Sequence, residues 1–340
     1  MSIEQTAEPT FAGHQTFHPR FGWIKKGFDA AVEQPTIFTE PDAPVRLGVG
    51  KNMVEAIRFW TAAVRVLAKV PNPERPRMAI SVPTNIGEAL LVQQGLDPYF
   101  EDSTTLAMLH WLALSQPSSL PAWQVAFSDF NAVEFEPAAL TEAIEEQVSA
   151  TTRKMPNKSS LVKDTDCLLR MYSVRETRNR ESIDELLDSP FRELGLIVPA
   201  PGRPGAFRFQ RGRKPTVTST AIAYACIDFL HCTDPHATTI SLSRLLNDEL
   251  SPGRIFKLTD ETLREYLEIA VADHSGLRIA TPAGSPQLAL LGDPQIVARE
   301  LLARRREDRG LSSVIPTVAL VGPTARGILA GRRVLAEALA

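Results

Sequence analysis

Apolar residues between positions 42 and 70 recur at steps of three and four, and this spacing constrains the fold more than any other feature of the chain. They are Val54, Ile57, Trp60, Ala63, Val64 and Leu67. Such a stripe is typical of an amphipathic helix with one buried face. Just upstream, Ala43 and Leu47 have the spacing of a shorter helix, which Gly48 interrupts. The stretch therefore predicts two helices joined by a tight turn at the glycine.

The residues that follow extend this pattern. A proline-rich turn leads to a strand-like run at Met78–Val82. Thr84 is placed to cap a further helix, because a threonine hydroxyl at this position accepts a hydrogen bond from a free backbone N–H group. The order of short helix, turn, longer helix and strand pair is that of a winged helix-turn-helix unit, whose second helix enters the major groove of DNA.

The glycines at 48 and 50, with the lysine after them, also resemble a loop that binds nucleotide phosphates. That loop requires G-x-x-x-x-G-K followed by serine or threonine, because the hydroxyl group holds a magnesium ion. Here Asn52 stands at the hydroxyl position and Val45 at the position of the first glycine. The sequence therefore argues against a nucleotide-binding loop.

We expect Lys51 and Asn52 instead to begin a recognition helix, with Arg58 exposed opposite the Val54–Ile57 core face. Asparagine can form paired hydrogen bonds with adenine, and arginine or lysine can contact guanine or phosphate. The alternative is a helix that packs only against protein, as in an adaptor.

A similar order of elements recurs loosely further along the chain. Residues 183–214 predict a helix ending in ELGLI, a turn and the alternating strand AFRFQRGR. Residues 240–291 predict a short helix, a turn, a helix capped by Thr259 and a two-stranded wing. Between the first unit and these, residues 96–135 are helical and apolar, with several aromatic side chains suited to a core. Repeated architecture of this kind predicts related structural units.

The predicted fold is mainly α with small β wings (α+β), in which multiple winged helix-turn-helix-like units surround a helical hub. The expected divisions are an N-terminal winged-helix-like unit at 1–92, the helical hub at 93–182, C-terminal winged-helix-like units at 183–295 and a tail at 296–340.

Charge is distributed unevenly along the 340 residues, whose net charge is −3. DNA binding would therefore require local basic surfaces. One basic stretch spans 202–214 without an acidic residue, and it contains Arg203, Arg208, Arg211, Arg213 and Lys214. Another spans 153–180, where eight basic residues outnumber three acidic ones. A solvated surface is the alternative interpretation of both stretches.

The N-terminal segment GHQTFHPRFGWIKKGFD carries five further candidates for phosphate contact. They are His14, His18, Arg20, Lys25 and Lys26. The two histidines are four residues apart, which on a helix would suit a metal ion, but Pro19 disfavours helix at the residue before it and no acidic or cysteine ligand lies nearby. We expect the histidines and the arginine either to form a polar network or to approach phosphate with the two lysines.

The sequence predicts no enzyme, metal or cofactor. It lacks the motifs G-x-S-x-G, H-E-x-x-H and paired C-x-x-C, and the trio His231, Cys232 and His236 lacks a fourth metal ligand. Three cysteines suggest a reducing compartment. With no secretion signal at the N-terminus and no apolar run near eighteen residues, we expect a cytoplasmic protein without membrane contact.

Four segments together resemble the bacterial family called DUF4007. They are GHQTFHPRFGWIKKGFD, DAPVRLGVGKNMVEAIRFW, GLDPYFEDSTTLAMLHWLALS and VKDTDCLLRMY. The resemblance covers most of residues 11–290. Members of this family are often encoded beside PAPS-reductase-like and cysteine-desulfurase-like proteins in DNA phosphorothioation and phage-defence gene clusters. The resemblance implies a role near DNA sulfur modification or its restriction, and it carries over no catalytic residue.

We therefore expect a DNA-binding accessory protein of a DNA sulfur-modification or phage-defence system, with double-stranded DNA and proteins of the same gene cluster as partners. One alternative is a protein-interaction scaffold that recruits a sulfur-transfer or restriction enzyme without touching DNA. Another is a transcriptional repressor, which predicts a dimer and a palindromic site.

Overall fold

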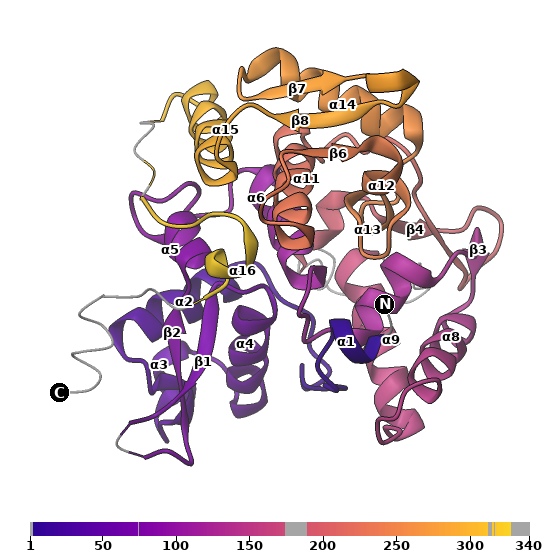
Figure 1. Cartoon of the computed structure of the whole chain (residues 1–340). Helices are drawn as coiled ribbons and strands as arrows, with labels where there is room; N and C mark the ends of the chain where they lie inside the picture. The colour runs from indigo at the N-terminus through magenta and orange to yellow at the C-terminus, as the bar shows by residue number, and fades with distance from the viewer. Residues whose placement is uncertain (1–2, 74, 174–188, 312–314, 316, 328–340) are drawn as a thin grey trace.

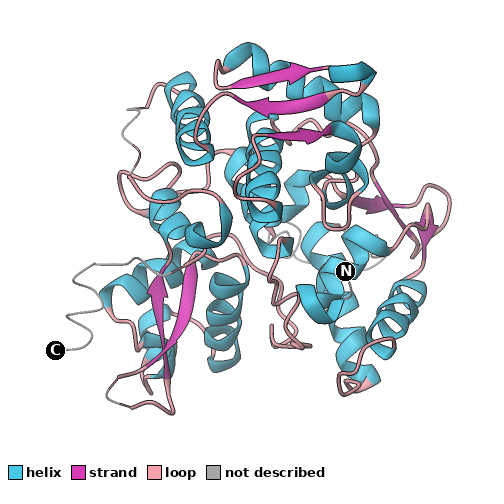
Figure 2. Cartoon of the chain, in the orientation of Figure 1, coloured by secondary structure: helices cyan, strands magenta, loops and turns pink. Residues whose placement is uncertain are grey.

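The computed structural model describes residues 3–73, 75–173, 189–311, 315 and 317–327. Helices make up most of its regular structure, and the strands of this part form three small antiparallel sheets (Figure 2). The expected fold class, mainly α with small β elements, is confirmed. The winged-helix interpretation of the individual units stays a prediction.

The first group of elements combines helices with one hairpin. It consists of α2 (Trp23–Glu33), η1 (Ile37–Thr39), α3 (Ala43–Leu47), α4 (Lys51–Ala63), β1 (Leu67–Pro71), β2 (Ala79–Pro83) and α5 (Asn85–Leu91). The two strands pair antiparallel, with Leu67 opposite Pro83. Helices α3 and α4, the turn between them and the following hairpin agree with the sequence prediction.

Helix α4 ends earlier than the apolar spacing indicated. Its last residue is Ala63, Arg65 adopts a left-handed φ of 62°, and Leu67 begins strand β1 rather than continuing the helical stripe. Val64 and Leu67 are buried in this arrangement, as they would be on a helix. A short apolar run therefore could not distinguish a last helical turn from the start of a buried strand.

The second group follows the chain from residue 103 to residue 209. It consists of α6 (Ser103–Leu114), α7 (Pro121–Gln124), the π-helical turn η2 (Val125–Asp129), β3 (Glu134–Phe135), α8 (Pro137–Ser149), α9 (Lys158–Tyr172), η3 (Pro190–Leu194), β4 (Ile197–Pro199) and β5 (Phe207–Phe209). Its sheet has the order β3-β5-β4. Strand β5 was expected, but the predicted helix ends at Leu194, and Ile197 begins strand β4 instead of ending that helix. The pairing of β3 with β5 was not expected.

The third group contains the expected long helix and its two-stranded wing. It consists of α11 (Ser219–Thr233), β6 (Thr239–Ser241), α12 (Leu242–Asn247), α13 (Pro252–Ile255), α14 (Asp260–Asp273), β7 (Leu277–Ala280), η4 (Pro282–Gly284) and β8 (Gln287–Leu290). Its sheet has the order β6-β8-β7. The predicted short helix at 240–247 is thus a three-residue strand followed by a helix. Three further helices are α1 (Ile3–Thr6), α15 (Pro294–Asp308) and α16 (Gly322–Ala325).

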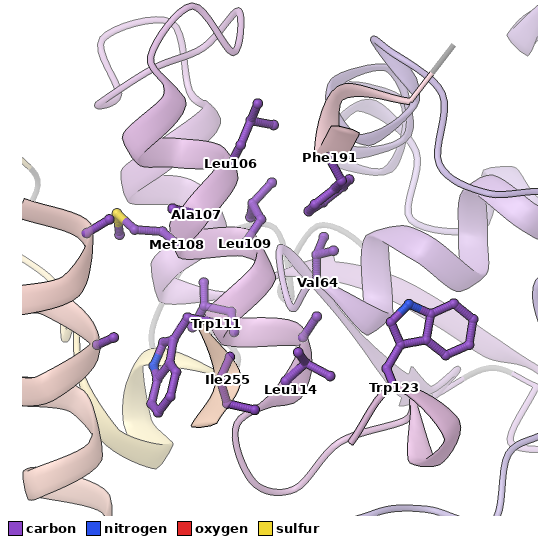
Figure 3. Close-up of a cluster of buried hydrophobic side chains, with 14 of the residues drawn as sticks. Val64, Leu106, Ala107, Met108, Leu109, Trp111, Leu114, Trp123, Phe191 and Ile255 are labelled. Carbon is purple, nitrogen blue, oxygen red and sulfur yellow. The ribbon is translucent and has the colours of Figure 1, made fainter. Parts of the chain in front are cut away.

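Helix α6 of the second group lies beside α11 of the third at the centre of the molecule, with the other elements around them (Figure 1). Nearly all residues of α6 are buried, and its side chains lie in one apolar cluster with Phe191 and Ile255 from other elements (Figure 3). A helix that is apolar on all sides belongs in a core. The expected apolar hub therefore corresponds to a buried central helix.

Polar contacts tie this helix to all three groups. The imidazole of His110 lies 2.8 Å from the hydroxyl of Tyr172 on α9 and 3.2 Å from the carbonyl oxygen of Ile255 on α13. One turn on, Trp111 Nε1 donates to Asp228 Oδ2 of α11 at 2.6 Å. The guanidinium of Arg65, from the first group, donates to the carbonyl oxygen of Leu112.

The two expected helix caps are present, and Asp102 supplies a third. The side chain of Thr84 accepts a hydrogen bond from the N–H of Gly87 at 3.0 Å, and that of Thr259 accepts one from Thr262 at 3.3 Å. Asp102 caps α6 by accepting from the N–H of Thr104 at 2.9 Å. Each cap satisfies a backbone donor that the first helical turn leaves free.

The divisions expected at residues 92, 182 and 295 stay a prediction. The predicted basic stretch at 153–180 is described only to residue 173, so its arginines at 175, 178 and 180 lie outside the described residues. Among the helices that are described, none has the length and apolar character needed to cross a membrane.

Candidate nucleic-acid interface

The turn between α3 and α4 exposes the start of the longer helix. Gly48 adopts a φ of 62°, a left-handed conformation that glycine accepts without the strain a Cβ would add. The N–H of Val49 closes the turn by donating to the carbonyl oxygen of Pro44 at 3.0 Å. Lys51 and Asn52 follow as the first two residues of α4, and both are exposed. Their side chains therefore project beside the free N–H groups of the helix terminus.

The outer face of α4 continues from its N-terminus towards its middle. Arg58 is partly exposed. Its guanidinium lies 3.9 Å from the carboxylate of Glu55, three residues earlier on the same helix, and forms an ion pair with it. Ala56 and Phe59 are buried together with the predicted core face, so the exposed strip is narrower than the sequence indicated. Surface pairs of this kind contribute little to stability, and Glu55 can release the arginine to another anion.

Helix α2 packs closely against α4 and carries two of the predicted lysines. A Cβ placed on Gly27 would lie only 2.6 Å from Ile57, so this glycine allows the two helices to approach. Lys25 forms an ion pair with Asp29 at 2.5 Å, and Lys26 donates to the carbonyl oxygen of Leu47 at 3.1 Å. Lys26 thus helps to cap the end of α3, where a cation is favourable.

The loop before α2 buries both predicted histidines. His14 Nε2 lies 2.7 Å from Asp164 Oδ1, which also accepts a hydrogen bond from the N–H of Ala12. Burial, followed by the charge of Arg192, lowers the pKa of His18 to about 3. Arg20 is half-buried over the ring of Trp23. His14 is thus hydrogen-bonded to Asp164, and the rings of both histidines are buried.

The five basic residues predicted in the stretch 202–214, called here the basic hairpin, have different surroundings in the structure. Arg203 lies 3.3 Å from Glu134 and 3.8 Å from Glu136, and Arg213 is ion-paired with Glu265. Because the acids already neutralise these two arginines, less of their charge is available to phosphate.

The other three basic residues of the hairpin differ again. Arg208 is half-buried on the central strand β5. Lys214 is buried, and its ammonium donates to the carbonyl oxygen of Gly212 at 2.6 Å; burial lowers the pKa of Lys214 to about 7. Arg211 is exposed and has no carboxylate within ion-pair distance in the described part of the chain. Of the five predicted residues, Arg211 has the most accessible charge.

The predicted residues therefore do not form one surface. Lys51, Asn52 and Arg58 share the outer side of α4, and Lys25 lies on the neighbouring helix α2. The hairpin of β4 and β5 belongs to a different group of elements, and Figure 1 shows α4 at the lower left but β3 and β4 at the right edge.

One basic residue beside α4 escaped the sequence analysis. Lys69 is exposed on β1, and its side chain lines a cavity of about 260 Å³ together with Glu8 and Ala62. Partial burial, and then the charge of Arg58, lowers the pKa of Lys69. The sequence could have indicated Lys69 as an exposed basic residue on a strand at 67–71. It was missed because that stretch was interpreted as the end of a helix.

Comparisons with known proteins agree with the resemblance noted in the sequence. A family model described as "Protein of unknown function (DUF4007)" matches residues 11–305, and the chain belongs to this family. A solved structure described as "SspB crystal structure" is 35% identical, covers 90% of both chains and has a TM-score of 0.83. Another, "Magnesium ion-bound SspB crystal structure", is 34% identical, covers 93% of this chain and 94% of that chain and has a TM-score of 0.84. No curated protein matches the chain.

Proposed function

We propose that this member of the DUF4007 family is a DNA-binding accessory protein of a bacterial DNA sulfur-modification (phosphorothioation) or phage-defence system. The observation that carries the proposal is the exposed N-terminus of α4, where Lys51 and Asn52 follow a tight turn and precede a hairpin. Proposed partners are duplex DNA and proteins of the same gene cluster, PAPS-reductase-like and cysteine-desulfurase-like. The proposed role is binding, and no residue is assigned to catalysis.

The repeated order of elements supports winged-helix units as the means of contact. In the second and third groups a short strand precedes a helical segment and a hairpin, and that strand pairs with the last strand of the hairpin. The first group has two helices joined by a turn, followed by a hairpin. In helix-turn-helix proteins the residues at the start of the second helix contact base edges while neighbouring elements contact the backbone.

The proposed contacts on α4 differ in kind. Asn52 supplies an amide that can pair with an adenine edge, whereas Lys51 supplies a point charge for phosphate. Arg58 and Lys69 extend the basic surface towards the hairpin, where a wing would follow the DNA backbone. His14, His18 and Lys214 are left out of this surface because they are buried.

Reversing two charges on this helix tests the proposal. Lys51→Glu together with Arg58→Glu should weaken binding to plain duplex by tenfold or more at moderate salt, because two phosphate contacts become repulsive. A matched control is Arg244→Glu with Arg304→Glu, which makes the same change in charge at exposed positions on α12 and α15. Equal binding by both double variants would remove α4 from the interface.

Magnesium plays no assigned part in the proposal. It binds carboxylate oxygens and keeps several water ligands. Within the described ranges, no group of three or more His, Cys, Asp or Glu side chains is placed to hold a metal ion. Because one structural relative is described as magnesium-bound, duplex binding should be measured both with and without magnesium chloride.

A scaffold that touches no DNA is the second candidate. It is favoured by the ion pairs of Arg203 with Glu134 and of Arg213 with Glu265, which neutralise much of the predicted basic hairpin. A scaffold should purify with a partner from the same gene cluster and give no mobility shift with plain or phosphorothioate duplex. A shift by the isolated chain would contradict it.

A further inference from the structure

A polar cavity opens where the second and third groups of elements meet. Its volume is about 280 Å³, and the residues that matter to its chemistry are Ser128, Asn131, Arg211, Asn247, Arg254 and Lys257. They come from the end of η2, the segment after β5, helix α12 and the turn around α13. Figure 1 shows α13 below α12, with β4 of the second group to its right.

Positive charge exceeds negative charge around this cavity. Arg211 is exposed, and no carboxylate of the described residues lies within ion-pair distance of it. Arg254 lies 3.7 Å from Asp129 and donates to the carbonyl oxygen of Ser128 at 3.4 Å. Burial raises the pKa of Asp129, against the lowering effect of its hydrogen bond with Ser128. Among the described residues, the cavity is thus lined by three basic side chains and no carboxylate, with Asp129 and Glu249 nearby.

Lys257 lines the cavity, and backbone carbonyl oxygens hold its ammonium group. Its ammonium donates to the carbonyl oxygens of Ala126 and Phe130 at 3.1 and 3.2 Å, and it lies 4.3 Å from the centre of the Phe209 ring. Its own carbonyl oxygen accepts a hydrogen bond from Gly212 at 3.0 Å, which fixes it against the segment that carries Arg211.

Burial and the nearby basic side chains make a positive charge on Lys257 costly. The pKa of Lys257 is lowered to about 7, first by burial and then by the charges of Arg211, Arg254 and Lys214. The charge of Asp129 acts in the opposite direction and raises it. Crowded like charges raise the free energy of the empty cavity, and an anion would relieve that repulsion.

We propose that this cavity binds a phosphate group, supplied either by a nucleotide or by a DNA strand. Arginine presents a planar set of donors that matches phosphate oxygens, and the amides of Asn131 and Asn247 supply neutral donors beside it. The volume is at the lower end of ligand cavities, so it holds one phosphate with part of its sugar rather than a base pair. The inference rests on the proposed function only where DNA is the source of the phosphate.

Arg211→Gln is the variant that tests the cavity. The side chain is exposed, so the change removes a charge without opening the core. Arg244→Gln is the matched control, because Arg244 is exposed on α12 and ion-paired with Asp248 at 2.8 Å but does not line the cavity. Both variants lose one positive charge.

Calorimetric titration with inorganic phosphate, deoxyadenosine 5′-monophosphate and deoxyadenosine measures the binding. The parent and Arg244→Gln should bind the two phosphate-containing probes and not deoxyadenosine, and Arg211→Gln should bind them about tenfold more weakly. Tighter binding of the monophosphate than of inorganic phosphate would identify a nucleotide as the source. The proposal is overturned if the parent binds neither phosphate probe, or if Arg211→Gln binds them as the parent does.

Titration of the same proteins with plain duplex separates this inference from the proposed function. If the parent binds both phosphate probes through Arg211 but no duplex, the phosphate-binding proposal is supported and the proposed DNA-binding role is contradicted. If the parent binds duplex through α4 but neither phosphate probe, the DNA-binding role is supported and the phosphate-binding proposal is contradicted.

Discussion

The buried imidazole of His110 should make the protein sensitive to mild acid. Its Nε2 faces the carbonyl oxygen of Ile255, which can only accept, so Nε2 carries the proton and Nδ1 accepts from the hydroxyl of Tyr172. Burial lowers the pKa of His110 to about 3. The ring is therefore neutral in the folded protein at every pH near neutrality.

The direction and size of the effect follow from proton linkage. Between the ordinary histidine pKa of about 6.5 and the folded value, only the unfolded chain binds a proton at this site. Stability from His110 is thus complete above pH 6.5 and is lost as the pH falls. Each pH unit below 6.5 corresponds to about 1.4 kcal/mol, so a change from pH 7.5 to 5.0 costs about 2 kcal/mol. His18, with a similarly lowered pKa, adds a comparable amount.

His110→Gln tests this reasoning, because glutamine keeps an amide donor for Ile255 but does not titrate. Urea unfolding at pH 7.5 and 5.0, followed by tryptophan fluorescence, gives the free energy of unfolding. Between these pH values the variant should lose about 2 kcal/mol less than the parent, because the other buried groups titrate equally in both proteins. His236→Gln, at an exposed position, should lose as much as the parent. An equal loss in His110→Gln and the parent would refute the buried neutral imidazole.

Three further changes test the fold around the site by urea unfolding at pH 7.5. Gly48→Ala should lower the free energy of unfolding by about 1 kcal/mol, because the φ of 62° strains an alanine, and Gly50→Ala at φ −69° should lose less. Asp228→Asn should cost about 3 kcal/mol, because it removes the buried counter-ion of Arg326, and a loss below 1 kcal/mol would contradict that ion pair. Thr84→Ala should cost about 1 kcal/mol through loss of the α5 cap, and no change would show that the cap is dispensable.

Local signals allowed much of the fold to be predicted. Gly48 separates α3 from α4 because the turn needs a left-handed residue, and Thr84 and Thr259 mark helix starts because their hydroxyls accept backbone N–H groups. The wing of β7 and β8 was predicted because its strands are close in sequence. The information for these elements lies within a few residues of each of them.

Long-range pairing could not be predicted in this way. Strand β3 has two residues, Glu134 and Phe135, which are too few to show a period, and it exists only because β5 pairs with it. The site prediction was limited for the same reason, because residues far apart in sequence meet in the fold. Arg203 meets Glu134 from 69 residues away in sequence, and the approach of Arg254 and Lys257 to Arg211 depends on how two groups of elements pack.

Salt-dependent filter binding tests the central claim, that the N-terminus of α4 contacts DNA, most directly. Parent and the Lys51→Glu, Arg58→Glu variant are compared on plain and phosphorothioate duplex at 50 and 200 mM salt. If both residues contact phosphates, the parent should lose about twelvefold more affinity over this fourfold change than the variant, since each contact contributes about 0.9 to the logarithmic slope. Parallel salt dependence of the two proteins, or no binding of either duplex by the parent, would contradict the claim.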